Sequence, residues 1–387
     1  MEGDFIKINK WLLPFAWLYG LGVWLRNLLF DTGVIKSRRF DVPVISVGNI
    51  TVGGSGKTPH VEYLIRLLHD KVKVAVLSRG YKRKSRGYRL AKAGTTMPEI
   101  GDEPYQMHRK FKDIHVAVEA DRCKGIETLL SSEETKDTQL VLLDDAYQHR
   151  YVKPGLNILL VDYHRLIIYD KLLPAGRLRE PKEGKNRADI VIITKCPKDL
   201  KPMSFRVLQR AMALFPYQQL YFTTIDQGPL EPLFPEGESA PTPTEKLPHV
   251  LLVTGIASPE QMMKDLKGQC ESITPMQFSD HHLFTPSDLE AINMAFKMMP
   301  KPAIVITTEK DATRLETVKG LSAEVRKHIY VQPIRVSFML DEEEKFNNNI
   351  IDYVRKHQRN SLMAEGTHGD NAPSGDNSGN RSRTIGF

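Results

Sequence analysis

A glycine-rich segment near the start of the chain carries the residue types that bind nucleotide phosphates. Thr51-Val-Gly-Gly-Ser-Gly-Lys-Thr58 matches the P-loop pattern at its C-terminal half, although threonine replaces the usual first glycine. In this pattern backbone N–H groups surround the phosphate oxygens, the lysine reaches the β- and γ-phosphates, and the last hydroxyl coordinates magnesium. The expected nucleotide-binding residues are therefore Thr51, Val52, Gly53, Gly54, Ser55, Gly56, Lys57 and Thr58.

Two neighbouring carboxylates occur where a P-loop needs an acidic partner. Asp144 and Asp145 follow the apolar run Leu140-Val-Leu-Leu143, which reads as a buried strand. They would emerge at the C-terminal end of that strand, where α/β sheets bind ligands. We expect Asp144 to help hold Mg²⁺, directly or through water. Asp145 would do the same or would organise the Ala-Tyr-Gln-His149 segment that follows.

The identity of the nucleotide depends on a second strand end. Guanine-reading P-loop proteins commonly use an Asn/Thr-Lys-x-Asp tetrad after a strand. Thr194-Lys-Cys-Pro197 occurs in such a place, but proline replaces the carboxylate that would read guanine. The sequence therefore favours ATP, with Mg²⁺, over GTP.

Two further segments have the residue types needed for proton transfer. Gly101-Asp-Glu-Pro104 places adjacent carboxylates in a turn, and Asp280-His-His282 precedes a helix start at Thr285. An aspartate and a histidine could form a dyad that takes the proton from an attacking hydroxyl. The sequence does not show that the two segments meet, and a histidine is more often structural than catalytic.

The elements that would position these groups alternate between strands and helices. Apolar runs predict strands, and residues 58–68 have apolar positions at helical spacing. This alternation predicts a mostly parallel sheet with right-handed crossovers, as in P-loop NTPases. The expected strands are 42–47, 72–77, 114–118, 140–143, 158–161 and 190–193, followed later by 250–253, 303–307 and 329–331.

The fold class is α/β, and composition divides the chain into four parts. Residues 226–248 are rich in Pro, Gly and Glu, which is typical of a linker or long loop. The tail has little apolar content and is expected to be disordered. The expected parts are a hydrophobic membrane-associated helix in 1–35, a P-loop kinase core in 36–225, a smaller α/β domain in 226–360 and the tail in 361–387.

Composition limits the classes of partner. The chain has 387 residues and a net charge of +7, which favours acidic partners such as nucleic acid, anionic lipid or phosphate. No nucleic-acid-binding module is recognisable, so we expect no nucleic acid. The 3 cysteines are far apart and form no C-x-x-C pair, which indicates reduced thiols in the cytoplasm. No obligate protein partner is predicted.

The N-terminal segment is the most unusual stretch in composition. Residues 11–25 carry no charge and contain all 3 tryptophans, with Lys7 and Lys10 before them and Arg26 after. As a helix this run rises roughly 22 Å, short of the roughly 30 Å of a hydrocarbon core. A secretory signal is one alternative, but no small-residue cleavage site follows the segment. A buried core helix is the other alternative. The pattern favours a helix that dips into one leaflet.

Several motifs, in order along nearly the whole chain, resemble the signature of the tetraacyldisaccharide 4′-kinase (lipid A 4′-kinase) family. The joint occurrence is far more specific than a P-loop alone. The motifs are Gly48–Pro59, Ser78-Arg-Gly-Tyr81, Gly101-Asp-Glu-Pro104, Leu143-Asp-Asp-Ala-Tyr-Gln-His149, Pro174-Ala-Gly-Arg-Leu-Arg-Glu-Pro181, Phe278-Ser-Asp-His-His282 and Thr308-Glu-Lys-Asp311.

The resemblance implies transfer of the ATP γ-phosphate to the 4′-hydroxyl of a tetraacyldisaccharide 1-phosphate, forming lipid IVA. It implies that Asp102 activates the hydroxyl and that His281 assists from the second domain, with His282 a competing choice. Glu103 would support the site or its metal. Lys57 would join Asp102 and His281 in catalysis, and the expected metal ligands are Thr58, Asp144, Asp145 and Glu103.

A lipid acceptor stays in the bilayer, so the enzyme must reach it at the membrane surface. We expect localisation on the cytoplasmic face of the bacterial inner membrane, monotopic or peripheral. A basic stretch at residues 71–89 is either a solvated face or a surface for headgroups and phosphate. Arginine suits phosphate because its guanidinium forms a bidentate fork. The candidate contacts to the substrate are Arg79, Arg122, Arg177 and Arg179.

Two rival functions remain at this point. The chain could be a P-loop kinase of another lipid or small molecule, in which case a lipid-free acceptor would make the N-terminal segment dispensable. It could also be a membrane-associated ATPase switch without an acceptor. ATP hydrolysis measured with and without a lipid acceptor separates these classes.

Overall fold

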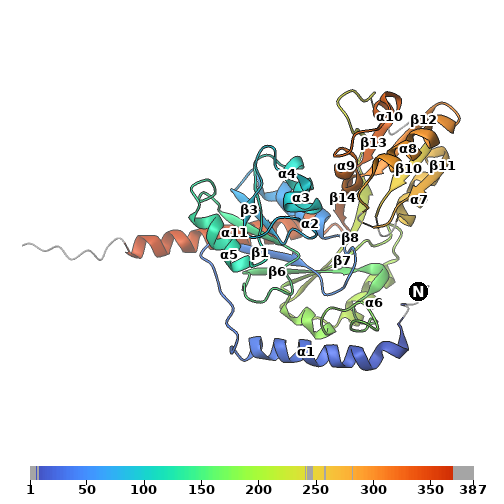
Figure 1. The fold of residues 1–387 in the computed structure, drawn as a ribbon. Helices are drawn as coiled ribbons and strands as arrows, with labels where there is room; N and C mark the ends of the chain where they lie inside the picture. The colour runs from blue at the N-terminus through green and yellow to red at the C-terminus, as the bar shows by residue number, and fades with distance from the viewer. Residues whose placement is uncertain are drawn as a thin grey trace, which may run out of the picture.

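Two β-sheets organise the chain in the computed structural model, which describes residues 6, 8–239, 241, 247–256, 259–280 and 282–368. The larger sheet has nine strands in the order β14-β8-β7-β6-β1-β5-β2-β4-β3. The smaller has five, in the order β11-β10-β12-β13-β9. Figure 1 shows the smaller sheet and its helices as a separate lobe beside the larger one. The α/β fold expected from the sequence is confirmed.

The larger sheet is mostly parallel, and only its edge strands β3 and β14 run antiparallel to their neighbours. Five strands, β1, β2, β4, β5 and β7, correspond to short apolar runs with mostly buried residues, as expected for a sheet covered on both faces. The bounds are β1 Val44–Gly48, β2 Val74–Ser78, β3 Arg89–Leu90, β4 His115–Val118, β5 Leu140–Asp144, β6 Leu156–Asp162, β7 Ile190–Thr194, β8 Gln219–Gln227 and β14 Ile334–Phe338.

Helices cover both faces of the larger sheet. On one face α2, α4 and α11 pack in one apolar core with alternate residues of β1 and β2; on the other, α5 and α6 pack over the remaining residues. The bounds are α2 Lys57–Leu68, α3 Met97–Ile100, α4 Asp102–Lys110, α5 Arg122–Ser131, α6 Pro202–Met212 and α11 Glu343–His368, with short helices η2 Tyr163–Arg165 and η3 Lys182–Arg187.

The smaller sheet has a core of its own, centred on β10 and β12 and covered by α8 and α9. Its strands are parallel except for the short edge strand β9. The strands and helices are β9 Glu231–Pro232, β10 Leu247–Thr254, α7 Glu260–Lys267, β11 Cys270–Gln277, α8 Pro286–Met298, β12 Ala303–Thr308, α9 Glu309–Leu315, α10 Ala323–His328 and β13 Ile329–Gln332.

The expected domain boundaries need correction at the C-terminal end. After β13 the chain returns to the larger sheet, where β14 pairs with β8 and α11 buries Phe346, Ile350 and Val354 in the core beneath α2. These elements therefore belong with the P-loop core and not with 226–360. Helix α11 continues to His368, past the expected start of the tail at 361; residues 369–387 lie outside the described part.

The N-terminal helix lies apart from both cores. Helices η1 (Lys10–Leu12) and α1 (Leu13–Asp31) form one segment in which only Ala16 and Phe30 are buried. The alternative of a buried core helix is therefore wrong. The segment Lys10–Asp31 has 22 residues and is apolar enough, by length and composition, to cross a membrane. It lies along one side of the larger domain (Figure 1).

Candidate active site

The glycine-rich segment is a loop between the central strand β1 and helix α2, as the P-loop pattern requires. Gly53 and Gly56 have φ angles of 119° and 82°, a region that side chains other than glycine rarely adopt. Helix α2 begins at Lys57, and Thr58 is buried in its first turn. The exposed residues Val52, Gly53 and Gly54 form the tip of the loop. Backbone N–H groups at this helix start suit a bound anion.

Side chains from outside the loop brace it. The Asn49 amide donates to the Ser55 hydroxyl at 2.7 Å, and the Thr194 hydroxyl donates to the Ser55 carbonyl at 3.0 Å. The Lys195 ammonium donates to the Gly54 carbonyl and pairs with Asp162 at 2.8 Å. The Thr194–Pro197 segment, which lacks the guanine-reading carboxylate, therefore supports the phosphate loop instead.

The strand-end aspartates lie beside the loop because β5 pairs with β1, placing Asp144 opposite Val47. Asp145 contacts the Lys57 ammonium at 3.6 Å and Arg179 at 3.5 Å. Asp144 is fully buried; its Oδ2 accepts a hydrogen bond from Ser78 at 3.1 Å, while its Oδ1 has no partner among the described residues. A buried carboxylate oxygen left unpaired in this way fits a metal ligand.

Burial raises the pKa of Asp144 to about 7, with further increases from the charges of Glu103 and Asp145 and a partial offset from Lys57. In the folded protein the Asp144 carboxyl group therefore stays protonated up to about pH 7, whereas the reference aspartate has a pKa of 3.8. The contribution of this group to the free energy of unfolding is therefore greatest below the reference pKa. It is lost as pH rises toward 7.

We expect Asp144→Asn to stabilise the fold while abolishing phosphate transfer, because the amide carries no charge to desolvate. The midpoint of thermal unfolding should rise by about 2–4 °C for each kcal/mol of relief, more at pH 8 than at pH 5. Calorimetry at the two pH values tests this. An equal gain at both would show that ionisation of Asp144 does not limit stability.

The two turn carboxylates begin helix α4 and face the smaller domain. Asp102 pairs with Arg314 at 2.5 Å, and Glu103 pairs with Lys310 at 2.7 Å. Both partners are on α9, which directly follows strand β12. The charge of Glu103 also acts on Asp144, so the α4 start lies within electrostatic reach of the metal candidates. The structure therefore brings the Asp102 segment within electrostatic reach of Asp144 and into contact with the second domain.

Of the two histidine candidates, the structure describes His282 but not His281. His281 lies outside the described residues, so its position relative to Asp102 stays a prediction. The Nε2–H of His282 donates to the Asp288 carboxylate at 2.9 Å, and the His282 ring stacks on Phe278 with ring centroids 4.8 Å apart. Asp288 also caps α8 by accepting from Thr285. These contacts give His282 a structural role at the start of α8.

The four candidate arginines occupy three different environments. Arg79 and Arg177 are exposed, and a Cβ on Gly53 would lie 4.0 Å from Nη1 of Arg177. Arg179 donates to Asp145 and to the Gln148 amide oxygen, at 3.5 and 3.3 Å. Arg122 differs from the expected surface contact: it is buried and donates to the carbonyls of Glu119, Ala120 and Asp144. Burial lowers the pKa of Arg122 to about 10.

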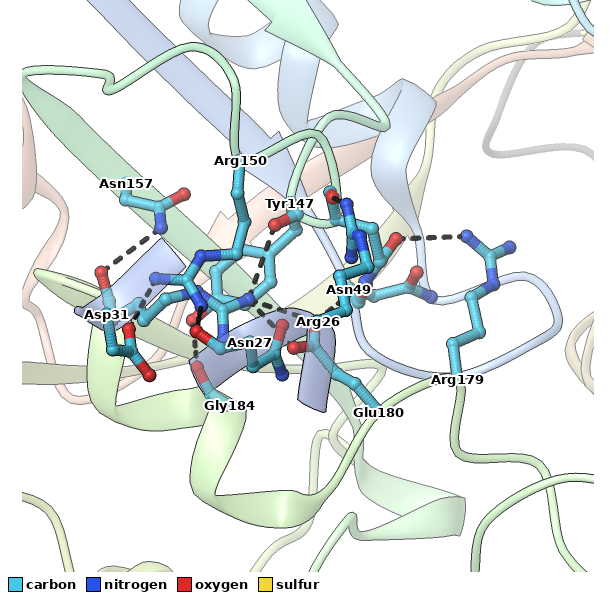
Figure 2. Close-up of polar contacts among 12 residues, drawn as sticks. Arg26, Asn27, Asp31, Asn49, Tyr147, Arg150, Asn157, Arg179, Glu180 and Gly184 are labelled. Carbon is cyan, nitrogen blue, oxygen red and sulfur yellow. Dashed lines mark hydrogen bonds and ion pairs between the residues drawn. The ribbon is translucent and has the colours of Figure 1, made fainter. Parts of the chain in front are cut away.

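Helix α1 contacts the segment that follows the two aspartates (Figure 2). Arg26 donates to the Gln148 carbonyl at 2.7 Å, and Arg150 donates to the Asn27 carbonyl at 3.1 Å and pairs with Asp31 at 2.5 Å. The Gln148 amide in turn bonds to Glu180 at 3.1 Å. One polar network therefore joins the apolar helix to the residues beside Asp145.

The sequence alone did not identify the residues that form ion pairs between segments far apart in the chain. Lys310 lies within the Thr308-Glu-Lys-Asp311 motif, and Arg314 follows the motif by three residues. The available signal was one basic side chain within this motif and another just after it, at a strand end where α/β folds place ligand sites. Lys195 lies in what resembles a guanine-binding pattern, and nothing local in the sequence shows that its ammonium donates to the Gly54 carbonyl.

A P-loop whose lysine pairs with a strand-end aspartate, on a mostly parallel sheet, defines a P-loop nucleotide-binding protein. A profile of the family described as tetraacyldisaccharide-1-P 4′-kinase matches residues 8–355. The chain belongs to the tetraacyldisaccharide 4′-kinase family, ATP-dependent kinases of lipid A biosynthesis.

Relatives and a solved structure agree with this assignment over most of the chain. The tetraacyldisaccharide 4′-kinase of Phocaeicola vulgatus is 60% identical over 93% of this chain and 99% of its own length. That of Bacteroides thetaiotaomicron is 52% identical over 94% and 98%. The crystal structure of LpxK from Aquifex aeolicus in complex with ATP matches 89% of this chain and 98% of its own, with a TM-score of 0.68 and 32% identity.

Proposed function

We propose that this chain transfers the γ-phosphate of ATP to the 4′-hydroxyl of a tetraacyldisaccharide 1-phosphate, forming lipid IVA. In a chain of this family, one observation carries the proposal. The buried Asp144 lies beside strand β1, which leads into the phosphate loop, and the charge of Glu103 at the start of α4 acts on it. The neighbouring Asp102 pairs with Arg314 of the smaller domain. Phosphoryl transfer depends mainly on alignment and charge neutralisation, which such an arrangement supplies.

Mg²⁺ fits the side chains on one side of the loop. Thr58 and Asp144 would hold it, with Asp145 and Glu103 as further ligands, and the unpaired Oδ1 of Asp144 supports this assignment. When bound, the ion neutralises charge on the transferring phosphoryl group. Lys57 neutralises the same charge from the loop, and Asp102 takes the hydroxyl proton as the sugar oxygen attacks phosphorus and ADP leaves. His281 would assist Asp102.

The direct test is transfer of labelled γ-phosphate from ATP to a lipid A disaccharide monophosphate in detergent micelles, with Mg²⁺ and with EDTA. Magnesium-dependent labelling of the lipid is the expected result. Release of free phosphate without labelled lipid would instead favour the ATPase switch. Labelling of a soluble sugar or an unrelated lipid in preference would favour another kinase.

We further propose that α1 lies in the cytoplasmic leaflet of the inner membrane and does not cross it. The contacts of η1 and α1 with the larger domain extend from the capping residue Asn9, which donates to the Ala175 carbonyl at 3.0 Å, to Asp31 at the far end of α1. A spanning orientation would have to break them. The exposed surface of η1 and α1 includes Trp11, Trp17 and Trp24. Tryptophans at the membrane interface would anchor the helix there, and the nearby polar network would keep the active site close to the lipid acceptor.

Replacing Trp17 and Trp24 by serine should weaken binding to anionic lipid vesicles by at least about tenfold, since each large apolar side chain contributes about 1.5–3 kcal/mol when buried. Co-sedimentation measures this. The matched control replaces Met294 and Met298 on α8 of the smaller domain, which are also exposed, by serine. Equal losses in both pairs would show that the membrane contact is not specific to α1.

A further inference from the structure

One guanidinium is buried at the contact between the two domains. The side chain of Arg314, on α9, is 1% exposed. Its Nε and Nη2 both donate to Oδ2 of Asp102, at 3.0 and 2.5 Å. Its Nη1 donates to Oδ1 of Asp311 at 3.0 Å and to the Gly255 carbonyl at 3.4 Å. The planar fork therefore joins the turn carboxylate of the larger domain to the interior of the smaller one.

Asp311 fixes the orientation of this arginine. It is fully buried, and its Oδ2 accepts from the Gly255 N–H at 2.9 Å and from the Thr308 hydroxyl at 2.7 Å. The Asp311 N–H bonds back to Thr308 at 3.1 Å, which closes the first turn of α9. Because both oxygens of Asp311 are engaged within the smaller domain, Arg314 is presented to Asp102 from a rigid support.

The rest of the α4–α9 contact is different in kind. The other pairs are Glu103 with Lys310, Arg109 with Glu316 and Lys110 with Glu309, and each includes a side chain that is at least 26% exposed. Exposed pairs of this type are sufficient to hold two surfaces together weakly. A buried ion pair adds little net stability because desolvation offsets the attraction, so adhesion alone does not explain Arg314.

We propose that Arg314 is a positioning residue for phosphate transfer: it orients the carboxylate of Asp102 toward the acceptor hydroxyl, and Asp311 aligns Arg314. This rests on the role of Asp102 in the proposed function. The arrangement makes the orientation of Asp102 depend on α9 being seated on α4. A residue assigned to the larger domain is thus held in place by the smaller one.

The first test compares three single variants in the micelle assay. Arg314→Met should lower kcat by about 10- to 100-fold, because displacement of a reacting group by about 1 Å has effects of that size. KM for ATP should stay within about twofold. Arg314→Lys, which keeps the charge but loses the fork, should restore part of the loss. Arg109→Met breaks a pair in the same contact and serves as the matched control, with little change in kcat.

Removing Arg314 alone takes its guanidinium away from the charges of Asp102 and Asp311, which is expected to destabilise the domain contact. The double variant Asp311→Asn/Arg314→Met also removes the buried charge of Asp311, and it should show the same loss of kcat with a midpoint of thermal unfolding closer to that of the wild type. Recovery of wild-type kcat in the double variant would overturn the proposal, since the loss would then be one of folding.

A double-mutant cycle with Asp102→Asn provides the decisive readout. If Arg314 acts through Asp102, adding Arg314→Met to Asp102→Asn should cost less than about twofold in kcat. The same fold-loss in both backgrounds would overturn the role of Arg314 and leave the proposed function intact. A wild-type kcat in Asp102→Asn alone would overturn the role of Asp102, and that of Arg314 with it.

Discussion

Replacing Lys57 by alanine is expected to lower kcat for lipid phosphorylation by about 10³-fold or more while the fold is retained. The ammonium lies at the start of α2, beside the exposed loop tip and 3.6 Å from Asp145. In that position it neutralises charge on the β- and γ-phosphates, and such preorganised charge commonly supplies factors of this size. Initial rates of label transfer at saturating ATP measure the effect.

The control for this substitution is Lys92→Ala. Lys92 is exposed and pairs only with an exposed partner, Glu134, at 2.6 Å among the described contacts. It should transfer phosphate at the wild-type rate. Thermal unfolding of both variants checks the fold. A Lys57→Ala protein that retains wild-type kcat would remove the phosphate loop from the mechanism.

Asp102→Asn should lower kcat by about 10²- to 10⁴-fold, the range for losing a general base. The amide keeps the shape of the side chain but cannot accept the hydroxyl proton. Binding of ATP should change little, because Asp102 lies at the start of α4 and not in the phosphate loop. Separate measurement of kcat and of the affinity for a fluorescent ATP analogue resolves the two quantities.

The matched control is Asp113→Asn, an exposed aspartate shortly after the end of α4. It is expected to leave both quantities unchanged. A loss of ATP affinity in Asp102→Asn, with kcat preserved at saturation, would make Asp102 a structural carboxylate. Its pairing with Arg314 would then serve the domain contact alone.

The larger sheet was predictable because short stretches of the sequence specify its strands. A buried parallel strand reads as a short apolar run, and the glycine-rich turn fixes strand before and helix after. Strands β1, β5 and β7 and helix α2 accordingly fall where the sequence indicated. The positions of Lys57 and Asp144 follow from the same logic, since neighbouring parallel strands end at the same edge.

The interdomain contacts were not predictable, because nothing local specifies them. Asp102 and Arg314 are 212 residues apart in the chain. Strand β14 carries no strong apolar pattern, and its place beside β8 is set by tertiary pairing and not by propensity. The burial of Arg122 was missed for a related reason. The sequence shows a basic side chain but not the carbonyl groups around it.

The return of the chain to the larger sheet has a consequence for synthesis on the ribosome. Strands β9–β13 form one uninterrupted stretch, whereas the larger sheet needs β14 and α11, which are translated after them. Until Phe346, Ile350 and Val354 emerge, the apolar surface of α2 lacks part of its cover. The smaller domain is therefore expected to be complete first, although it begins in the second half of the chain. The nucleotide-binding domain is translated first, but its core is complete only after the last helix, α11, has been synthesised.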